Sequence, residues 1–306
     1  MASRTPLLSV VIPTHDNLAA LRQCLDSWRR FTAAERVELL VIEDACDDGT
    51  PAYLAQVAKT PWCRKTLRVF HEADVHELRC DNRGFAEARG SLLLAWQDDM
   101  FVRAGWFVPE VLRAFARIPE LGMLGLIRGL RLFPLVHPLE RWADLHRPQH
   151  LESTLGPGGP LNWFRLAEVD SVVRPWVVRR ACLDAVGPLN EAFVPTEWDE
   201  ADLAYRVRRA GWAVATHGYE RLGAFFHVGS ATVGRELAES YKARALRNGQ
   251  VFRERWEATI HAEADRMRRT WARPLRPISL PALVARAAAA GAGRLRRPRS
   301  RDTSAP

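Results

Sequence analysis

The first hundred residues alternate short apolar runs with amphipathic stretches, and this alternation restricts the fold more than any other feature of the chain. Dense β-branched and aliphatic runs of this length are typical of strands buried on both faces. They stand at residues 7–13, 37–44, 67–71 and 91–97. Between the first two, residues 18–31 place apolar side chains at helical spacing, with Asp16 or Asn17 as the expected cap. This order predicts an α/β fold with a mostly parallel central sheet flanked by helices.

The second half of the chain is less regular. Residues 107–118 are expected to form a helix and residues 121–127 a strand. A Pro- and Gly-rich stretch at 146–161 predicts a long loop of the kind that often covers a functional site. A helix is expected at 200–211, and a longer, highly charged helical segment at about 235–271.

The positive charge of the chain is concentrated near its C-terminus. Within the net charge of +8, residues 241–306 hold 16 Lys/Arg and 5 Asp/Glu, so the rest of the chain is slightly acidic. Specific nucleic-acid binding is not favoured, because the tail has few aromatic side chains for base stacking. We expect residues 273–306 to form a disordered basic tail, in which 280–297 could lie as an amphipathic helix on an anionic membrane. A solvated, alanine-rich tail is the alternative.

Nothing in the composition indicates secretion or a membrane span. The chain has no run of about 18 apolar residues, and its N-terminus lacks the pattern of a signal peptide. Its five cysteines never form a CxxC spacing, so neither a disulfide framework nor a zinc site is indicated. We therefore expect a cytoplasmic protein, with peripheral attachment to the inner face of the membrane as an alternative.

Acidic residues cluster where the predicted elements end. Asp44 ends the second strand, and Asp98 and Asp99 end the fourth. In an open α/β sheet, ligands bind outside the carboxyl ends of the strands, so these carboxylates are expected to converge. Paired carboxylates suit a hard divalent cation such as Mn²⁺ or Mg²⁺, and the cation in turn would bind a diphosphate.

Each of these residues also has a structural explanation when it is taken alone. An aspartate after a strand is often a turn residue, and Asp199 or Glu200 at a helix start is favourable with the helix dipole. His227, in the apolar context FFHV, is by itself more often a core histidine than a ligand. The order of these residues along the chain, more than any one of them, indicates a function.

In this order the chain resembles the family-two glycosyltransferases of the GT-A fold over roughly residues 7–233. The segments that carry the resemblance are SVVIPTHDN, LLVIEDACDDGT, NRGFAEARGSLLLAWQDD, VDSVVRPWVVRRACLDAVGPLNEAF, EWDEADLAYRVRRAGW and FHVGSATVG. The resemblance implies a GT-A catalytic domain at 1–233, with a nucleotide-sugar half at about 1–130 and an acceptor half at about 131–233. A helical extension at 234–272 would follow.

The resemblance also implies roles for individual residues. Donor binding is implied for Pro13, Thr14, His15, Asp44 and Asp98. The family's usual Asn-x-Gly is replaced by ADVHELRCDN, and Arg79 within it and Arg83 directly after it are the candidates to contact the diphosphate instead. Asp99 would bind Mn²⁺ or Mg²⁺ together with His227. Glu200 would be the catalytic base and Asp199 is its nearest competitor, because the pair reads Asp-Glu where the family has Glu-Asp. Gln97 stands where a third carboxylate is common.

Helix geometry also favours Glu200 over its neighbour. Consecutive helical residues lie about 100° apart, so Asp199 and Glu200 cannot point the same way. Asp202 shares the face of Asp199 and is expected to pair with Arg206, four residues further on. The helix N-terminus is expected to keep Glu200 ionised.

The implied activity is inverting transfer of a sugar from a nucleotide diphosphate donor, UDP- or dTDP-linked, to an acceptor hydroxyl. The acceptor would be a saccharide or a lipid-linked molecule in polysaccharide or glycoconjugate synthesis. One alternative is a non-catalytic scaffold that binds sugar nucleotides. Another is a metal-dependent nucleotidyltransferase, although its usual Gly- and Lys-containing phosphate loop is missing from PTHDN.

Overall fold

The structure is a computed structural model of the whole chain. It describes residues 7–33, 36–132, 150–151, 165–228, 235–270 and 273–277. The loop expected at 146–161, apart from 150–151, and the tail after residue 277 lie outside the described residues.

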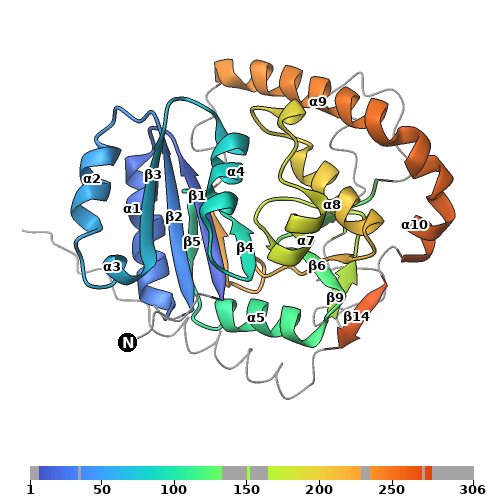
Figure 1. Cartoon of the computed structure of the whole chain (residues 1–306), viewed down its shortest axis with the longest axis horizontal. Helices are drawn as coiled ribbons and strands as arrows, with labels where there is room; N and C mark the ends of the chain where they lie inside the picture. The colour runs from blue at the N-terminus through green and yellow to red at the C-terminus, as the bar shows by residue number, and fades with distance from the viewer. Residues whose placement is uncertain are drawn as a thin grey trace, which may run out of the picture.

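A nine-stranded sheet forms the centre of the described protein (Figure 1). In spatial order its strands are β14 (Pro274–Pro277), β9 (Arg165–Glu168), β12 (Ala213–Thr216), β6 (Leu121–Gly125), β11 (Trp176–Arg179), β4 (Leu92–Ala95), β1 (Leu8–Thr14), β2 (Val37–Asp44) and β3 (Leu67–Glu72). Strands β9 and β11 run against the other seven. The predicted α/β fold with a mostly parallel sheet is therefore confirmed.

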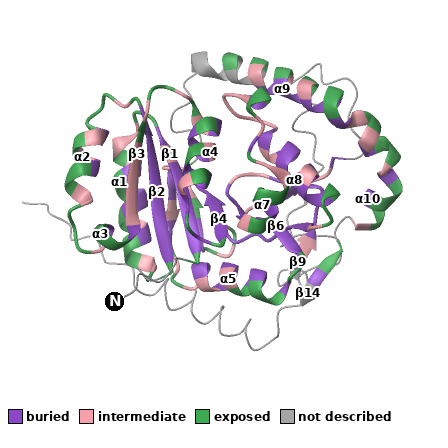
Figure 2. Cartoon of the chain, viewed as in Figure 1, coloured by how far each residue is buried: buried purple, intermediate pink, exposed green. Residues whose placement is uncertain are grey.

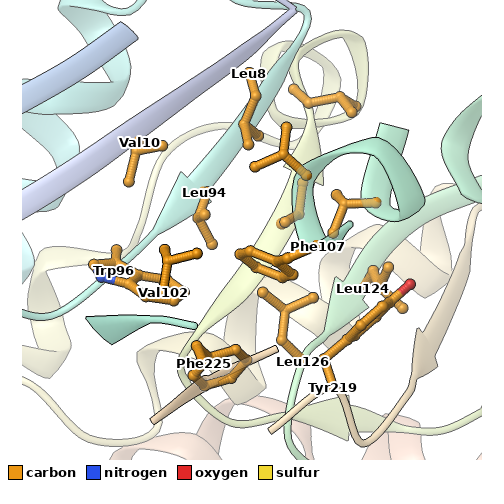
Figure 3. Packing of buried hydrophobic residues seen from close by; sticks show 14 of the residues in the cluster. Leu8, Val10, Leu94, Trp96, Val102, Phe107, Leu124, Leu126, Tyr219 and Phe225 are labelled. Carbon is orange, nitrogen blue, oxygen red and sulfur yellow. The ribbon is translucent and has the colours of Figure 1, made fainter. Parts of the chain in front are cut away.

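One face of the sheet is covered by α1 (Leu18–Phe31) and α5 (Phe107–Arg117). Helix α1 buries its apolar stripe, which includes Leu21, Leu25 and Trp28, because these residues recur at helical spacing. Aromatic rings fill the centre of this core, where Trp96 packs against Phe225 with ring centroids 5.1 Å apart (Figure 3). The shorter α2 (Thr50–Val57) and α3 (Cys63–Thr66) flank the same side near β3.

The opposite face carries one helix from the first hundred residues together with the helices of the C-terminal half. They are α4 (Glu77–Glu87), α7 (Arg180–Val186), α8 (Asp199–Arg209), α9 (Arg235–Ala262) and α10 (Ala264–Thr270), with the short 3₁₀ helix η2 (Glu191–Phe193). Helix α4, which the sequence analysis did not predict, lies so close to β1 that a Cβ atom at Gly84 would stand 2.2 Å from Val11. Only glycine permits this approach, which brings the start of α4 to the ends of the strands.

Two small sheets lie beside the central one. Strands β5 (Met100–Val102) and β13 (Phe225–His227) form an antiparallel pair. Strands β7 (Gly129–Leu130), β8 (His150–Leu151) and β10 (Ser171–Val172) form the other. The β5–β13 pair matters for function, because it brings His227 next to the residues that follow β4.

The long helix α9 shares a core with α8 and so belongs to the same folded unit (Figures 1 and 2). The Trp256 ring meets the Tyr205 ring edge-on at 5.0 Å, and its Nε1 donates a hydrogen bond of 2.8 Å to Asp202. The buried Asn248 donates to the carbonyls of Phe193 and Thr196, just before α8. The segment expected as a helical extension at 234–272 therefore helps to hold the start of α8.

The ordered part of the chain extends further toward the C-terminus than the sequence analysis predicted. A tail was expected from residue 273, yet Pro274–Pro277 form the edge strand β14 on β9. Leu275 is buried and Arg273 forms a 2.6 Å ion pair with Glu168. Prolines are tolerated there because an edge strand leaves one row of amides unpaired.

This edge strand predicts two different outcomes of truncation. A chain that ends after residue 277 is expected to melt at the temperature of the full chain. A chain that ends after residue 270 loses Leu275 from the core and should be about 2 kcal/mol less stable, as expected for one buried leucine. Calorimetry of both truncated proteins checks this, and equal melting temperatures for the two would show that β14 contributes nothing.

Candidate active site

The carboxyl ends of β1 and β4 meet through direct hydrogen bonds. Thr14, the last residue of β1, donates its hydroxyl to Asp98 Oδ2 over 2.7 Å, and the Asn17 amide donates to Asp98 Oδ1 over 2.9 Å. The two strands are parallel neighbours, so their ends reach the same edge of the sheet. Thr14 and Asp98, both predicted donor-binding residues, are thus in contact.

Asp98 has a raised pKa, so its charged and neutral forms are both populated near pH 7. Burial raises the pKa of this carboxyl group to about 7, the hydrogen bonds from Thr14 and Asn17 partly offset that rise, and the adjacent Asp99 adds to it. Two neighbouring carboxylates in a site with little water repel each other. A bound cation would favour the ionised form of both.

Asp99 and His227 lie together, although 128 positions separate them in the chain. Antiparallel pairing of β5 and β13 sets His227 opposite Met100, and the Val228 amide donates to the Asp99 carbonyl. His227 Nε2 then lies 3.4 Å from Asp99 Oδ1. That oxygen is buried and accepts no hydrogen bond from the described residues. A carboxylate oxygen that accepts no hydrogen bond and lies beside an imidazole nitrogen is a suitable ligand for a divalent cation.

Asp44 is buried and holds the turn that leads into α4. Its two carboxylate oxygens accept hydrogen bonds from the amides of Val75 and His76, over 2.8 and 2.9 Å. The His15 Nδ1 atom lies 2.6 Å from the Asp44 carbonyl, and this hydrogen bond raises the pKa of the imidazole. His15 and Asp44 are therefore neighbours at the ends of β1 and β2, as expected. Contact with a donor base stays a prediction for Asp44.

The two arginines that were predicted to bind the donor, Arg79 and Arg83, form ion pairs with glutamates. Arg79 pairs with Glu191 at 3.0 Å, and Arg83 lies 3.4 Å from both Glu72 and Glu87. Pro13 lies within β1, one residue before Thr14. Within the described part of the chain, neither Arg79 nor Arg83 forms an ion pair with Asp98 or Asp99, so their contact with a diphosphate stays a prediction.

Helix α8 separates its acids as the sequence analysis expected. Asp202 pairs with Arg206 over 2.7 Å, which confirms that predicted structural pair. Asp199 is fully buried and lies 3.2 Å from the guanidinium of Arg174. Glu200 is only partly buried, so it is the more accessible acid of the two.

The expectation that the helix N-terminus would keep Glu200 readily ionised is wrong. Burial, and next the neighbouring Asp199 carboxylate, raise the pKa of Glu200 well above its ordinary value. The helix dipole is worth only about 0.3–1 kcal/mol, whereas burial can shift a carboxyl pKa by several units. A raised pKa makes Glu200 a stronger base once it is ionised.

The site also contains three residues that were not predicted from the sequence, namely Arg174, Glu77 and Asp81. Arg174, which precedes β11, contacts Glu77 and Asp81 of α4 as well as Asp199 of α8. Gln97 donates its amide to Glu77 over 3.2 Å, so the same group reaches the end of β4. The one sequence signal for this group is Arg174 itself, a single arginine inside the mostly apolar segment VDSVVRPWVV.

His227 gives a test that separates a ligand from a core residue. We expect His227→Ala to raise the metal concentration needed for activity while the melting temperature moves by only a few degrees, because the side chain is 26% exposed. His217→Ala is the matched control, since His217 is fully buried against Tyr219. It should lower the melting temperature strongly and leave metal dependence unchanged. The reverse pattern would make His227 a core residue.

The chain is similar to known glycosyltransferases and related proteins in sequence. Residues 9–129 match the family described as Glycosyl transferase family 2. The chain is 27% identical over 284 residues, 85% of its length, to an uncharacterised protein of Sinorhizobium fredii, of which it covers 28%. It is 33% identical over 202 residues, 62% of its length, to the O-antigen biosynthesis protein RfbC of Myxococcus xanthus, of which it covers 14%. The chain thus spans less than a third of these curated relatives.

The fold is similar to that of a solved glycosyltransferase. GalNAc-T7, determined with UDP, GalNAc and Mn²⁺, superposes with a TM-score of 0.54 and 15% identity, over 70% of this chain and 43% of that one. At this identity the likeness concerns the fold, which is the GT-A arrangement. Residues 9–129 of the chain are thus similar to the family-two glycosyltransferases, and the GT-A fold agrees with that match.

Proposed function

We propose that this chain is an active, inverting glycosyltransferase that uses a nucleotide diphosphate sugar. The observation that carries the proposal is the buried Asp99 carboxylate, whose bare oxygen lies beside His227 and next to Asp98. The family match supports it, because it covers this acidic pair. The raised pKa of Glu200 adds a carboxyl group that is a stronger base than an ordinary glutamate once it is ionised.

The donor half would use the ends of β1, β2 and β4. Thr14, His15 and Asp98 would contact the nucleoside, and Asp99 and His227 would hold Mn²⁺ or Mg²⁺. When bound, such a cation neutralises charge on a departing diphosphate. The GalNAc-T7 structure contains UDP and Mn²⁺, which favours a UDP-sugar here, with a dTDP-sugar as the alternative.

The acceptor half would supply the base. Glu200 would take the proton of the acceptor hydroxyl while that oxygen attacks the anomeric carbon from the side opposite the diphosphate. The bond to the diphosphate breaks as the new bond forms, so the configuration inverts in one displacement. General-base catalysis of this kind is typically worth about 10²–10⁴-fold in rate.

The name of one relative supports the proposed acceptor class. RfbC is named for O-antigen biosynthesis, which favours a saccharide or lipid-linked acceptor in polysaccharide or glycoconjugate synthesis. No helix among the described residues is long and apolar enough to cross a bilayer. We propose a cytoplasmic enzyme whose basic tail attaches it to an anionic membrane surface. Flotation with anionic liposomes should therefore require residues 278–306, and equal flotation without them would remove the membrane role.

A screen of nucleotide sugars tests the function. The purified protein is incubated with each UDP- and dTDP-sugar and Mn²⁺, with and without EDTA, and release of the nucleoside diphosphate is measured. We expect release from one donor class, and its loss with EDTA. Binding of a donor without any release would support the scaffold instead. Formation of a nucleoside triphosphate and a sugar 1-phosphate from the nucleotide sugar, once pyrophosphate is added, would indicate a nucleotidyltransferase.

A further inference from the structure

A group of buried acids surrounds one arginine between α4 and α8. The guanidinium of Arg174 contacts Glu77 through Nη1, and its Nη2 lies 2.8 Å from Asp81 Oδ2 and 3.2 Å from Asp199 Oδ2. Arg174 is 8% exposed, and both aspartates are almost completely buried. The guanidinium fork is rigid and planar, so it holds these partners in fixed directions.

The charges in this group do not balance. One guanidinium faces Glu77, Asp81 and Asp199, and Glu200 follows Asp199 directly. Burial raises the pKa of Asp81 and of Glu200, and the charge of Arg174 opposes that rise in both. The negative charges of Asp199 and Glu197 raise the pKa of Glu200 further, whereas the positive charge of Arg174 lowers it. The protonation state of Glu200 therefore depends on the charge of Arg174.

The same group reaches the donor end of the site. Gln97, the residue before Asp98, donates its amide to the Glu77 carboxylate that Arg174 also contacts. A carboxylate at position 97 would face Glu77 with like charge. This accounts physically for glutamine at the position, and it gives one set of polar contacts from the end of β4 to the start of α8.

On the basis of the proposed function, we propose that Arg174 is the positioning residue of Glu200. Its guanidinium fixes the start of α8 through Asp199 and the start of α4 through Glu77. Its positive charge offsets that of Asp199, so that Glu200 loses its proton more readily than it would without the arginine and can then receive the proton of the acceptor hydroxyl. Arg174 itself need not touch either substrate.

Direct titration of Glu200 tests the charge effect without any assay of turnover. The protein is labelled with ¹³C at the glutamate carboxyl groups, and Glu200→Gln identifies the Glu200 resonance. In Arg174→Gln we expect Glu200 to titrate at higher pH than in the wild type, because a favourable charge has been removed. Arg174→Lys, which keeps the charge but loses the fork, should titrate between the two.

Kinetics test the positioning effect. Arg174→Gln should lower kcat for transfer by roughly 10²-fold with little change in the KM for the donor, since misplacement of a catalytic group by about 1 Å has effects of this size. The acidic limb of the pH–rate profile should move to higher pH. Arg208→Gln is the matched control, because Arg208 is equally buried and lies 3.6 Å from Asp170 and 3.7 Å from Glu168, at the other end of α8. It should lower the melting temperature and leave the acidic limb in place.

The outcomes are distinguishable. If Glu200 titrates at the same pH in Arg174→Gln and in the wild type, the proposal is overturned. If Arg174→Gln does not fold, the comparison is made in Arg174→Lys, which keeps the charge but loses the fork, and an unchanged titration of Glu200 there overturns the proposal equally. If the titration shifts but the wild type transfers no sugar, the positioning of Glu200 stands and the proposed function fails.

Discussion

Replacement of Asp99 by asparagine is expected to abolish sugar transfer and leave the fold intact. The substitution keeps the shape of the side chain and removes the charge that would bind a divalent cation. Its Oδ1 atom accepts no hydrogen bond from the described residues, so little folding energy is lost with the charge. We expect a loss of about 10²–10³-fold in kcat, typical of the removal of one key electrostatic contact, with a melting temperature close to that of the wild type.

Asp170→Asn is the matched control for this experiment. Asp170 is also a buried acid, but it accepts a hydrogen bond from the Leu132 amide and lies beside Arg208, away from the strand ends. The Asp170→Asn variant should be less stable than the wild type and should keep its specific activity. Full activity of Asp99→Asn, or undiminished activity of the wild type in excess EDTA, would remove the metal assignment.

The choice of catalytic base leads to the second large effect. Glu200→Gln should leave donor binding unchanged and lower transfer by about 10²–10⁴-fold, because glutamine has the same shape and cannot accept the proton. Transfer by the wild type should fall as the pH decreases through the raised pKa of Glu200, since only the carboxylate acts as a base. This acidic limb should lie at higher pH than that of an ordinary glutamate.

Asp199→Asn separates the two acids of α8. It should retain measurable transfer, because Asp199 is buried against Arg174 and has no path to an acceptor, although the loss of that ion pair will reduce stability. If Asp199→Asn abolishes transfer while Glu200→Gln remains near normal, the base has been assigned to the wrong residue. If both variants stay fully active, neither acid is the base.

Much of the fold could be predicted because its signals are local. A strand buried on both faces needs a dense apolar run, and each such run in the first hundred residues is a strand. The pair of Asp202 and Arg206 was also predictable, since residues four apart on a helix are neighbours. The contact of Thr14 with Asp98 follows from the rule that parallel strands end at one edge.

The remaining features depend on contacts between distant segments. Asp16 or Asn17 was expected to cap α1, and Asn17 does occupy the N-cap position. Its side chain donates to Asp98, however, and the first amide of the helix donates to Asp48 from the loop after β2. Helix α4 escaped prediction because its apolar residues are few and its close packing depends on Gly84 beside Val11. Arg174 meets acids from α4 and α8, and no spacing in the sequence relates those positions.

The edge strand β14 also bears on the biosynthesis of the protein. Leu275 pairs with Leu166, so this edge of the sheet is completed by residues made more than 100 positions later. Until those residues leave the ribosome, β9 presents an unpaired row of backbone groups that another nascent chain could bind. Such late, long-range pairing is intrinsically slow. The yield of soluble protein from cells should therefore fall more steeply than its equilibrium stability when β14 is weakened.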